Sequence, residues 1–386
     1  MISGCNLSPL FFCLFISQLG QELNSSGLGI DLDNLNLSAL LFADDLVIIG
    51  KNKQALANLM SKTRTFFHKH RLDISVLKSK IMNHDSSTGK TTFQDFNDLP
   101  PLTLENVVFF KYLGVTVSSS PHSFFKNFNE TVKKKASAYL SSVLSMTKTG
   151  PDRSEMAYMT WKHIALPAIL YGSEVMPLTQ DTISSIESCQ TRIAKFILQV
   201  PQSSANVSSN LDAGFEPVWS TLAQRVLLYA HSTMMKPETN WAKKALSEQI
   251  FQGSKSPYTR FLLKWKSATN CFGVSADLIK SNVKNSAISH ILASKQQVCS
   301  STFAMNCPEE TKDWFKLKLW VGDTATSKII AQFRSCNSRL GNRGPAKNGE
   351  YYKLCPLCAK TGITALNNEV CTVLEQIIIF TITPLF

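Results

Sequence analysis

Long apolar runs are missing from this sequence, and with them the usual marks of export and membrane insertion. A membrane-spanning helix needs about 20 consecutive apolar residues, and the best candidate, residues 7–19, is shorter. This stretch has the composition of a signal-peptide core, but residues 1–6 contain no lysine or arginine, which such signals require. The apolar run at 377–386 is shorter still. We therefore expect an intracellular protein, cytoplasmic or nuclear, with no signal peptide and no transmembrane segment.

Dense cysteine spacing and internal repeats are also missing, and acidic residues are few. The 10 cysteines are scattered, which suits a reducing compartment better than a secreted disulfide scaffold. The 28 acidic residues are outnumbered by 40 lysines and arginines, so the net charge is +12. This excess favours an anionic partner, of which nucleic acid is the commonest, although many basic proteins bind none. With 386 residues, 44% of them hydrophobic, the chain is long enough for several packed units.

The most informative stretch is residues 37–49, where two short apolar runs flank Asp44 and Asp45. Such runs predict a strand, a tight turn and a second strand. Turns of this length favour Asn-Gly or Asp-Gly, because glycine tolerates positive φ, so folding alone does not explain Asp-Asp. Adjacent carboxylates raise one another's pKa, and Mg²⁺, which takes oxygen ligands, would relieve the repulsion. The alternative is a solvated hairpin tip, but the flanking runs are too apolar for an exposed hairpin.

Helices and short strands are predicted on both sides of this pair. Ser8 is expected to cap the first helix, and Pro9 suits its first position, where the missing N–H costs nothing. The polar stretches 84–104 and 203–210 predict a connecting loop and a linker. Hydrophobic periodicity predicts helices over 8–24, 53–69 and 123–146, a strand over 72–77, and two strands over 107–117 that fold about Gly114.

Four short motifs resemble, in their order and spacing, those of one enzyme family. Phe42-Ala43-Asp44-Asp45 resembles the aromatic-Ala-Asp-Asp box of reverse transcriptases. Gly4 to Pro9 looks like the Gln-Gly-x-x-x-Ser-Pro element, with Ser3 in place of glutamine. Lys78-Ser79-Lys80 stands where the family has a lysine, and the segment 110–115 is similar to the hairpin that grips the primer end. The chain most resembles the non-LTR (LINE-type) retrotransposon group, whose region beyond the polymerase is similar to residues 166–174.

The resemblance implies an α+β fold with a partial polymerase palm, made of a small antiparallel sheet with helices. A mostly helical thumb and C-terminal region would follow. The helix over 123–146 carries Lys126 and the run Lys133-Lys134-Lys135; it would contact a duplex through phosphates, although such a run is usually just a solvated face. The implied domains are a partial reverse transcriptase palm at 1–117, a thumb-like region at 118–200, a helical C-terminal region at 201–345, and a degenerate cysteine-rich knuckle with an unrelated tail at 346–386.

The resemblance also implies the site residues and their partners. Asp44 and Asp45 would be catalytic and would hold Mg²⁺. The partners would be an RNA or DNA primer–template and a dNTP. For the lysines of the nucleotide site, a solvated basic turn is an equally good explanation. The nucleotide- and template-binding residues would be Gly4, Ser8, Pro9, Phe42, Ala43, Lys78 and Lys80, and the primer grip would be Lys111, Tyr112, Leu113 and Gly114.

One carboxylate of the family's metal site has no counterpart here. The family takes it from a strand upstream of the Gly4–Pro9 element, at which this sequence begins; Asp31 and Asp33 do not match its position. We therefore expect a truncated RNA-directed DNA polymerase that is inactive alone, with an unpaired sheet edge through which chains could associate. The alternatives are a non-catalytic nucleic-acid-binding protein derived from it and a product that barely folds.

A weak zinc motif lies near the C-terminus. Cys355 and Cys358 have knuckle-like Cys-x₂-Cys spacing, and Cys371 follows where the family usually has histidine. Gln376 stands at the fourth position, and no histidine follows His290. Structural zinc takes four ligands, mostly Cys and His, so a Zn²⁺ site is not expected.

Overall fold

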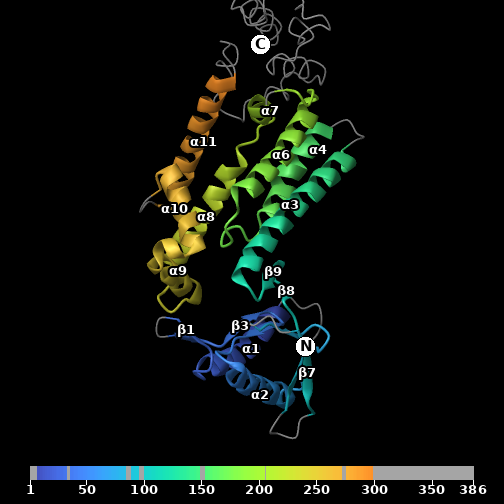
Figure 1. Cartoon of the computed structure of the whole chain (residues 1–386), viewed down its shortest axis with the longest axis vertical. Helices are drawn as coiled ribbons and strands as arrows, with labels where there is room; N and C mark the ends of the chain where they lie inside the picture. Colours follow the sequence, from blue (N-terminus) through green and yellow to red (C-terminus); the bar gives the residue numbers. More distant parts are fainter. Residues whose placement is uncertain are drawn as a thin grey trace, which may run out of the picture. The chain divides into compact units, whose positions relative to one another are not determined.

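The computed structural model describes residues 7–32, 35–83, 88–94, 100–147, 153–204, 206–271 and 275–298. Gly4, the cysteines at 355, 358 and 371, and the tail predicted at 346–386 lie outside the described residues. The described chain is α+β, with small, mostly antiparallel sheets in its first third and helices over most of the remainder (Figure 1). This confirms the predicted fold class.

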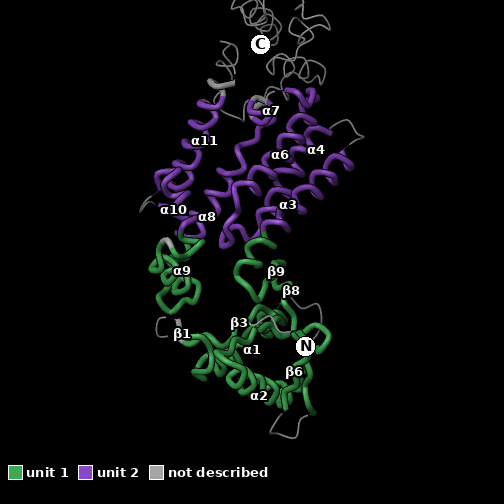
Figure 2. Tube along the Cα trace, in the orientation of Figure 1, with its two compact units in different colours: residues 1–128, 232–259 green, residues 129–231, 260–386 purple. Residues whose placement is uncertain are grey.

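The chain divides into two compact units (Figure 2). Unit 1 comprises residues 1–128 and 232–259, and unit 2 comprises residues 129–231 and 260–386. This division rests on backbone packing alone and assigns no role, so the palm, thumb and C-terminal domains stay predictions. None of the helices in the described part of the chain has the length and apolar character needed to cross a membrane.

The first core of unit 1 forms between two helices and one face of a hairpin. Helices α1 (Ser8–Asn24) and α2 (Lys53–Lys69) pack on one face of the hairpin of β3 (Ala39–Phe42) and β4 (Asp45–Ile48). The N-cap of α1 is Leu7 rather than the expected Ser8, and no side chain caps this end. The buried apolar residues of this core are Ile16, Leu19, Leu23, Ala39, Leu59 and Phe66.

Asn24, at the end of α1, fixes the helix to the hairpin. Its side-chain oxygen accepts hydrogen bonds from the backbone N–H groups of Ser38 (2.8 Å) and Ala39 (2.9 Å), and its Nδ2 donates to the Ala39 carbonyl (3.2 Å). One turn earlier in α1, a Cβ added to Gly20 would lie 2.5 Å from Leu41 Cδ1, so the helix and β3 are in close contact. The position of the hairpin is therefore set by α1.

A second core joins α2 to a three-stranded sheet of order β5–β7–β6. The strands are β5 (Lys80–Ile81), β6 (Gly89–Phe93) and β7 (Leu102–Asn106), with β5 parallel and β6 antiparallel to β7. The remaining strands of unit 1 form two separate hairpins, and helix α9 (Trp241–Phe251) contacts β1. These hairpins are β1 (Ile30–Leu32) with β2 (Leu35–Leu37), and β8 (Phe109–Tyr112) with β9 (Val115–Ser118).

Two further sequence predictions for unit 1 are wrong. The strand predicted over 72–77 does not form, because the chain turns after Ser75, whose carbonyl accepts from the N–H groups of Lys78 and Ser79 (3.1 and 2.9 Å). The loop predicted over 84–104 contains β6 and most of β7. There Thr92 and Thr103 pair across the strands with hydroxyls 2.9 Å apart, and Phe93 and Leu102 are buried.

Unit 2 is built on α6 (Gln180–Leu198), a long amphipathic helix. Thr179 caps its start by accepting from the Thr182 N–H, and Gln199 ends it in the left-handed conformation. The linker predicted over 203–210 is wrong, since α7 occupies 206–212 and packs on α6. The other helices that lie in unit 2 or extend into it are α3 (Pro121–Met146), α4 (Arg153–Thr160), α5 (Leu166–Ile169), α8 (Val218–Met234), α10 (Pro257–Thr269) and α11 (Ala276–Val298), and a π-helical turn, Trp161–Ala165, joins α4 to α5.

Candidate active site at a hairpin tip

The turn between β3 and β4 consists of Ala43 and Asp44, and Asp45 already belongs to β4, where it pairs with Phe42. The turn thus lies one residue earlier than an Asp-Asp turn would. Ala43 takes a positive φ of 51°, a conformation that costs a non-glycine residue about 1–3 kcal/mol. The hairpin therefore stores strain next to the two carboxylates.

The two faces of this hairpin differ. Directly paired residues of an antiparallel pair share a face, and faces alternate along the strands. The Ala39–Ile48 and Leu41–Leu46 pairs pack into the core beneath α1 and α2. Phe42 and Asp45 therefore lie on the opposite, open face, where Phe42 is 61% exposed. An acid beside an exposed aromatic ring on a supported strand is suited to ligand contact rather than to core packing.

Both carboxylates of the tip are exposed. Within the described residues, no lysine, arginine or histidine forms an ion pair with Asp44 or Asp45. Two adjacent carboxylates without a protein cation are the donor set that a hard divalent ion takes. The described residues bring no third His, Cys, Asp or Glu close enough to complete a metal-binding group, so the pair fits Mg²⁺ as a partial ligand set.

Tyr112 lies within electrostatic reach of this tip. Burial raises the pKa of its phenol, and the negative charge of Asp45 raises it further. Tyr112 ends β8, and the turn that follows places Leu113 and Gly114 at φ values of 45° and 80°. Positive φ at both central residues is typical of the tight type I′ hairpin turn, and glycine adopts it without strain. The Gly114 bend therefore lies two residues after Tyr112, whose phenol is affected by the charge of Asp45.

The other residues expected at the site differ in whether they are exposed to a ligand or held by a protein partner. Lys111 is exposed, and alternation along β8 places it on the face opposite Tyr112. Lys78 is exposed in its turn. Lys80, by contrast, is held by Glu105, with 2.6 Å between Nζ and Oε2, and this bond lowers the pKa of Glu105. Ser8 and Pro9 start α1, with Pro9 exposed.

Sequence reasoning did not find the partner of Lys80. Glu105 lies 25 positions away, and only the parallel pairing of β5 with β7 places the two residues opposite each other. No local motif signals such a pair, because both residues are ordinary choices for a strand at the surface. The pairing leaves Lys78, rather than Lys80, as the exposed lysine of this segment.

Residues 1–117 match the family model described as reverse transcriptase (RNA-dependent DNA polymerase). The matched segment contains the Asp44–Asp45 tip, both helices that support it, and most of the β8–β9 hairpin. No curated protein matches the chain. The match supports a reverse transcriptase domain over this part of the chain.

Proposed function

We propose that residues 1–117 form part of the palm of an RNA-directed DNA polymerase of a LINE-type retroelement, with Asp44 and Asp45 as its metal-binding carboxylates. The observation that carries this proposal is the geometry of the tip. Two acids that form no ion pair with the described residues end a hairpin whose other face is buried, and Tyr112 of a second hairpin lies close by. The retroelement type rests on the sequence motif at residues 166–174.

Each residue of the tip has a definite task in this proposal. Asp44 and Asp45 would hold Mg²⁺, which would supply activation of the primer 3′-oxygen and neutralisation of charge on the phosphates. The exposed ring of Phe42 packs against the sugar or base at the primer end. Tyr112, whose phenol carries a proton, donates a hydrogen bond to the sugar–phosphate backbone. Gly114 allows the bend that presents Tyr112.

We further propose that α3 acts as a thumb that contacts the nucleic acid backbone. Lys126 and Lys134 are exposed on this helix and suit phosphate contact. Lys133 does not serve this purpose, because it is held by Asp181 (2.6 Å) and Glu130 (3.1 Å), which raise its pKa. The thumb contact therefore depends on fewer lysines than the run of three suggests.

In a two-metal site the ions stabilise the attacking and leaving oxygens of an in-line displacement. To hold both ions, Asp44 and Asp45 would need at least one further carboxylate. We therefore expect no primer extension when the chain is supplied with Mg²⁺, primer–template and dNTPs and nothing else. Extension that disappears in Asp44→Ala would show that the chain by itself contains a complete site. Extension that survives in Asp44→Ala would exclude the tip as the catalytic centre.

Metal binding tests the site without depending on activity. Manganese is a paramagnetic substitute for Mg²⁺, and its binding to the full chain is measured by electron paramagnetic resonance. We expect a weak site that is lost in the double variant Asp44→Asn/Asp45→Asn. Asp73→Asn is the matched control, since Asp73 is an exposed acid of the same unit, and it should retain the site. Equal binding by the double variant and the control would refute the proposed ligands.

A further inference from the structure

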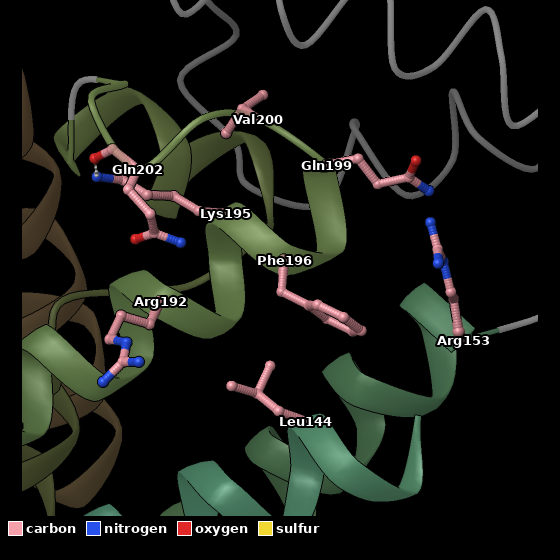
Figure 3. A pocket seen from close by; sticks show the side chains of 8 residues that line it. All are labelled: Leu144, Arg153, Arg192, Lys195, Phe196, Gln199, Val200 and Gln202. Atoms are coloured by element: carbon pink, nitrogen blue, oxygen red, sulfur yellow. Dashed lines mark hydrogen bonds between the residues drawn. The ribbon is translucent and has the colours of Figure 1, made fainter. Parts of the chain in front are cut away.

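A basic pocket lies in unit 2, at the C-terminal end of α6 (Figure 3). Its volume is about 400 Å³. Three cationic side chains line it, Arg153, Arg192 and Lys195, and no acidic side chain is among the described residues of its wall. The rest of the wall is formed by Leu144, Phe196, Gln199, Val200 and Gln202.

Lys195 is a buried cation without an anionic partner in the described chain. Only 5% of the residue is exposed, and its Nζ donates to the Gln202 carbonyl and to Asn206 Oδ1, both at 2.7 Å. Both acceptors are neutral, and burial lowers the pKa of the ammonium. A buried charge is costly unless an opposite charge lies nearby. An anion in the pocket would supply that charge, and an ammonium has a third N–H to donate.

The two arginines are open to a ligand. Within the described residues neither Arg153 nor Arg192 forms an ion pair. The Cζ of Arg153 lies 5.9 Å from the centre of the Phe196 ring. Figure 3 shows the guanidinium group of Arg192 directed away from that ring and from Arg153. The planar guanidinium group binds phosphate through two parallel hydrogen bonds. The pocket wall thus carries two phosphate-binding forks, one of which packs on an aromatic ring.

Arg192 also lines two adjoining hollows along α6, of about 470 and 510 Å³. The first lies between α3 and α6, and its wall is rich in hydroxyl groups, those of Ser137, Ser141, Ser184, Ser185 and Ser188. The second contains one acid, Glu187, whose Oε2 accepts from the Val218 N–H (3.1 Å) and whose pKa burial raises to about 7. The path along α6 is therefore positive and rich in hydrogen-bond donors.

We propose that the Arg153–Phe196–Arg192 pocket binds the phosphates of a nucleic acid strand that continues along α6. This site lies in unit 2 and is independent of the Asp44–Asp45 tip, so it goes beyond the polymerase function proposed above. An acidic peptide fits less well, because the serine hydroxyls and the aromatic ring suit a regularly spaced sugar–phosphate chain with bases. Sequence-tolerant strand binding commonly combines cations with aromatic rings in this way.

Binding of a labelled single-stranded oligonucleotide to the full chain, followed by fluorescence anisotropy over a range of salt concentrations, tests the proposal. The variant Arg153→Gln/Arg192→Gln should bind the oligonucleotide roughly tenfold more weakly. The slope of the logarithm of its binding constant against log[salt] should be shallower by about 0.7 for each phosphate that has lost its arginine. The control Arg260→Gln/Lys284→Gln removes the same charge from exposed positions of unit 2 and should keep most of the affinity. Equal effects of the two variants would overturn the site.

Chemical modification of arginine in the wild-type protein tests the same site without a variant, so its result does not depend on whether the variant folds. The oligonucleotide should protect Arg153 and Arg192 from phenylglyoxal, while Arg260 stays reactive, as read by mass spectrometry. Inorganic phosphate and polyglutamate are tested at matched charge concentration. Equal protection by phosphate would reduce the pocket to a simple anion site, and equal protection by polyglutamate would assign it to an acidic protein. Either result overturns the proposal, and neither bears on metal binding at Asp44 and Asp45.

Discussion

The phenol of Tyr112 reports on the acid at the hairpin tip. Burial and the charge of Asp45 both raise its pKa above the ordinary value of 10.0. The folded state therefore holds this proton more tightly than the unfolded state. The resulting stability is fully present below about pH 10 and is lost as the pH rises through the folded-state pKa.

Removing the charge of Asp45 should lower the pKa of Tyr112. Asp45→Asn is expected to shift the titration of this phenol towards 10, whereas Asp44→Asn, the matched control, should leave it in place, because Asp44 is not among the causes of the shift. Tyrosinate absorbance is recorded for each protein and for its Tyr112→Phe derivative, and the difference isolates this residue. Equal shifts in the two variants would contradict the placement of Asp45 beside Tyr112.

Glu187 is a buried acid whose ionisation opposes folding. Burial raises its pKa from 4.5 to about 7, although the Val218 N–H stabilises the charged form. The native state binds the proton more tightly, so the stability of the fold falls as the pH rises from about 4.5 to about 7.

The substitution Glu187→Gln should remove this loss, because the amide keeps an oxygen acceptor for the Val218 N–H and carries no charge. The free energy of unfolding of the variant, taken relative to that of the wild type, should rise by on the order of 3 kcal/mol between acid and pH above 7. Urea unfolding at several pH values measures the effect. His290 lines the same hollow in both proteins, so its contribution drops out when the free energy of unfolding of the wild type is subtracted from that of the variant. Parallel pH profiles of the variant and the wild type would refute the assignment.

At the scale of elements, the hydrogen bonds of the Asn24 side chain link α1 to the start of β3, the strand that leads to the Asp44–Asp45 tip. Asn24→Ala would leave the N–H groups of Ser38 and Ala39 without their side-chain acceptor. Loss of such bonds at a partly buried position costs about 1–3 kcal/mol. Ser25→Ala is the control, since that hydroxyl bonds only locally to the Glu22 carbonyl at an exposed position. Thermal unfolding should show a clear loss for Asn24→Ala and little change for Ser25→Ala; equal losses would contradict the role of Asn24.

Elements with a strong local signal could be predicted from the sequence. The helix over 53–69 and the two strands about Gly114 form where expected, because hydrophobic periodicity and a turn glycine are local properties. The strands β6 and β7 could not be predicted in the same way. Their stability comes from pairing with each other and from packing on α2, which no single segment displays.

The candidate site was predictable in part for the same reason. Asp44 and Asp45 are adjacent in sequence and carry a motif, so their position at a hairpin tip follows from local pattern. The position of the turn at Ala43 was not predictable, because an alanine at positive φ violates the usual preference. The ion pair of Lys80 with Glu105 was not predictable either, because it depends on the pairing of two strands whose paired residues are 25 positions apart in sequence.

At the scale of the whole molecule, chemistry is distributed unevenly over the two units. The match to the reverse transcriptase model ends at residue 117, within unit 1, and the acids at 44 and 45 belong to this segment. Unit 2 contributes helices whose cations gather at the end of α6. In the two proposals made above, unit 1 binds metal and unit 2 binds the nucleic acid backbone, so the two tasks are separate.

The metal site is tested most directly by mapping where a bound ion lies. Ferrous iron substituted for Mg²⁺ generates hydroxyl radicals that cut the backbone close to the ion. We predict cuts in the full chain around residues 42–46 and around Tyr112 to Gly114, both of which disappear in Asp44→Asn/Asp45→Asn and persist in Asp73→Asn. Cuts confined to other parts of the chain, or cuts at the tip that persist in the double variant, would contradict the account.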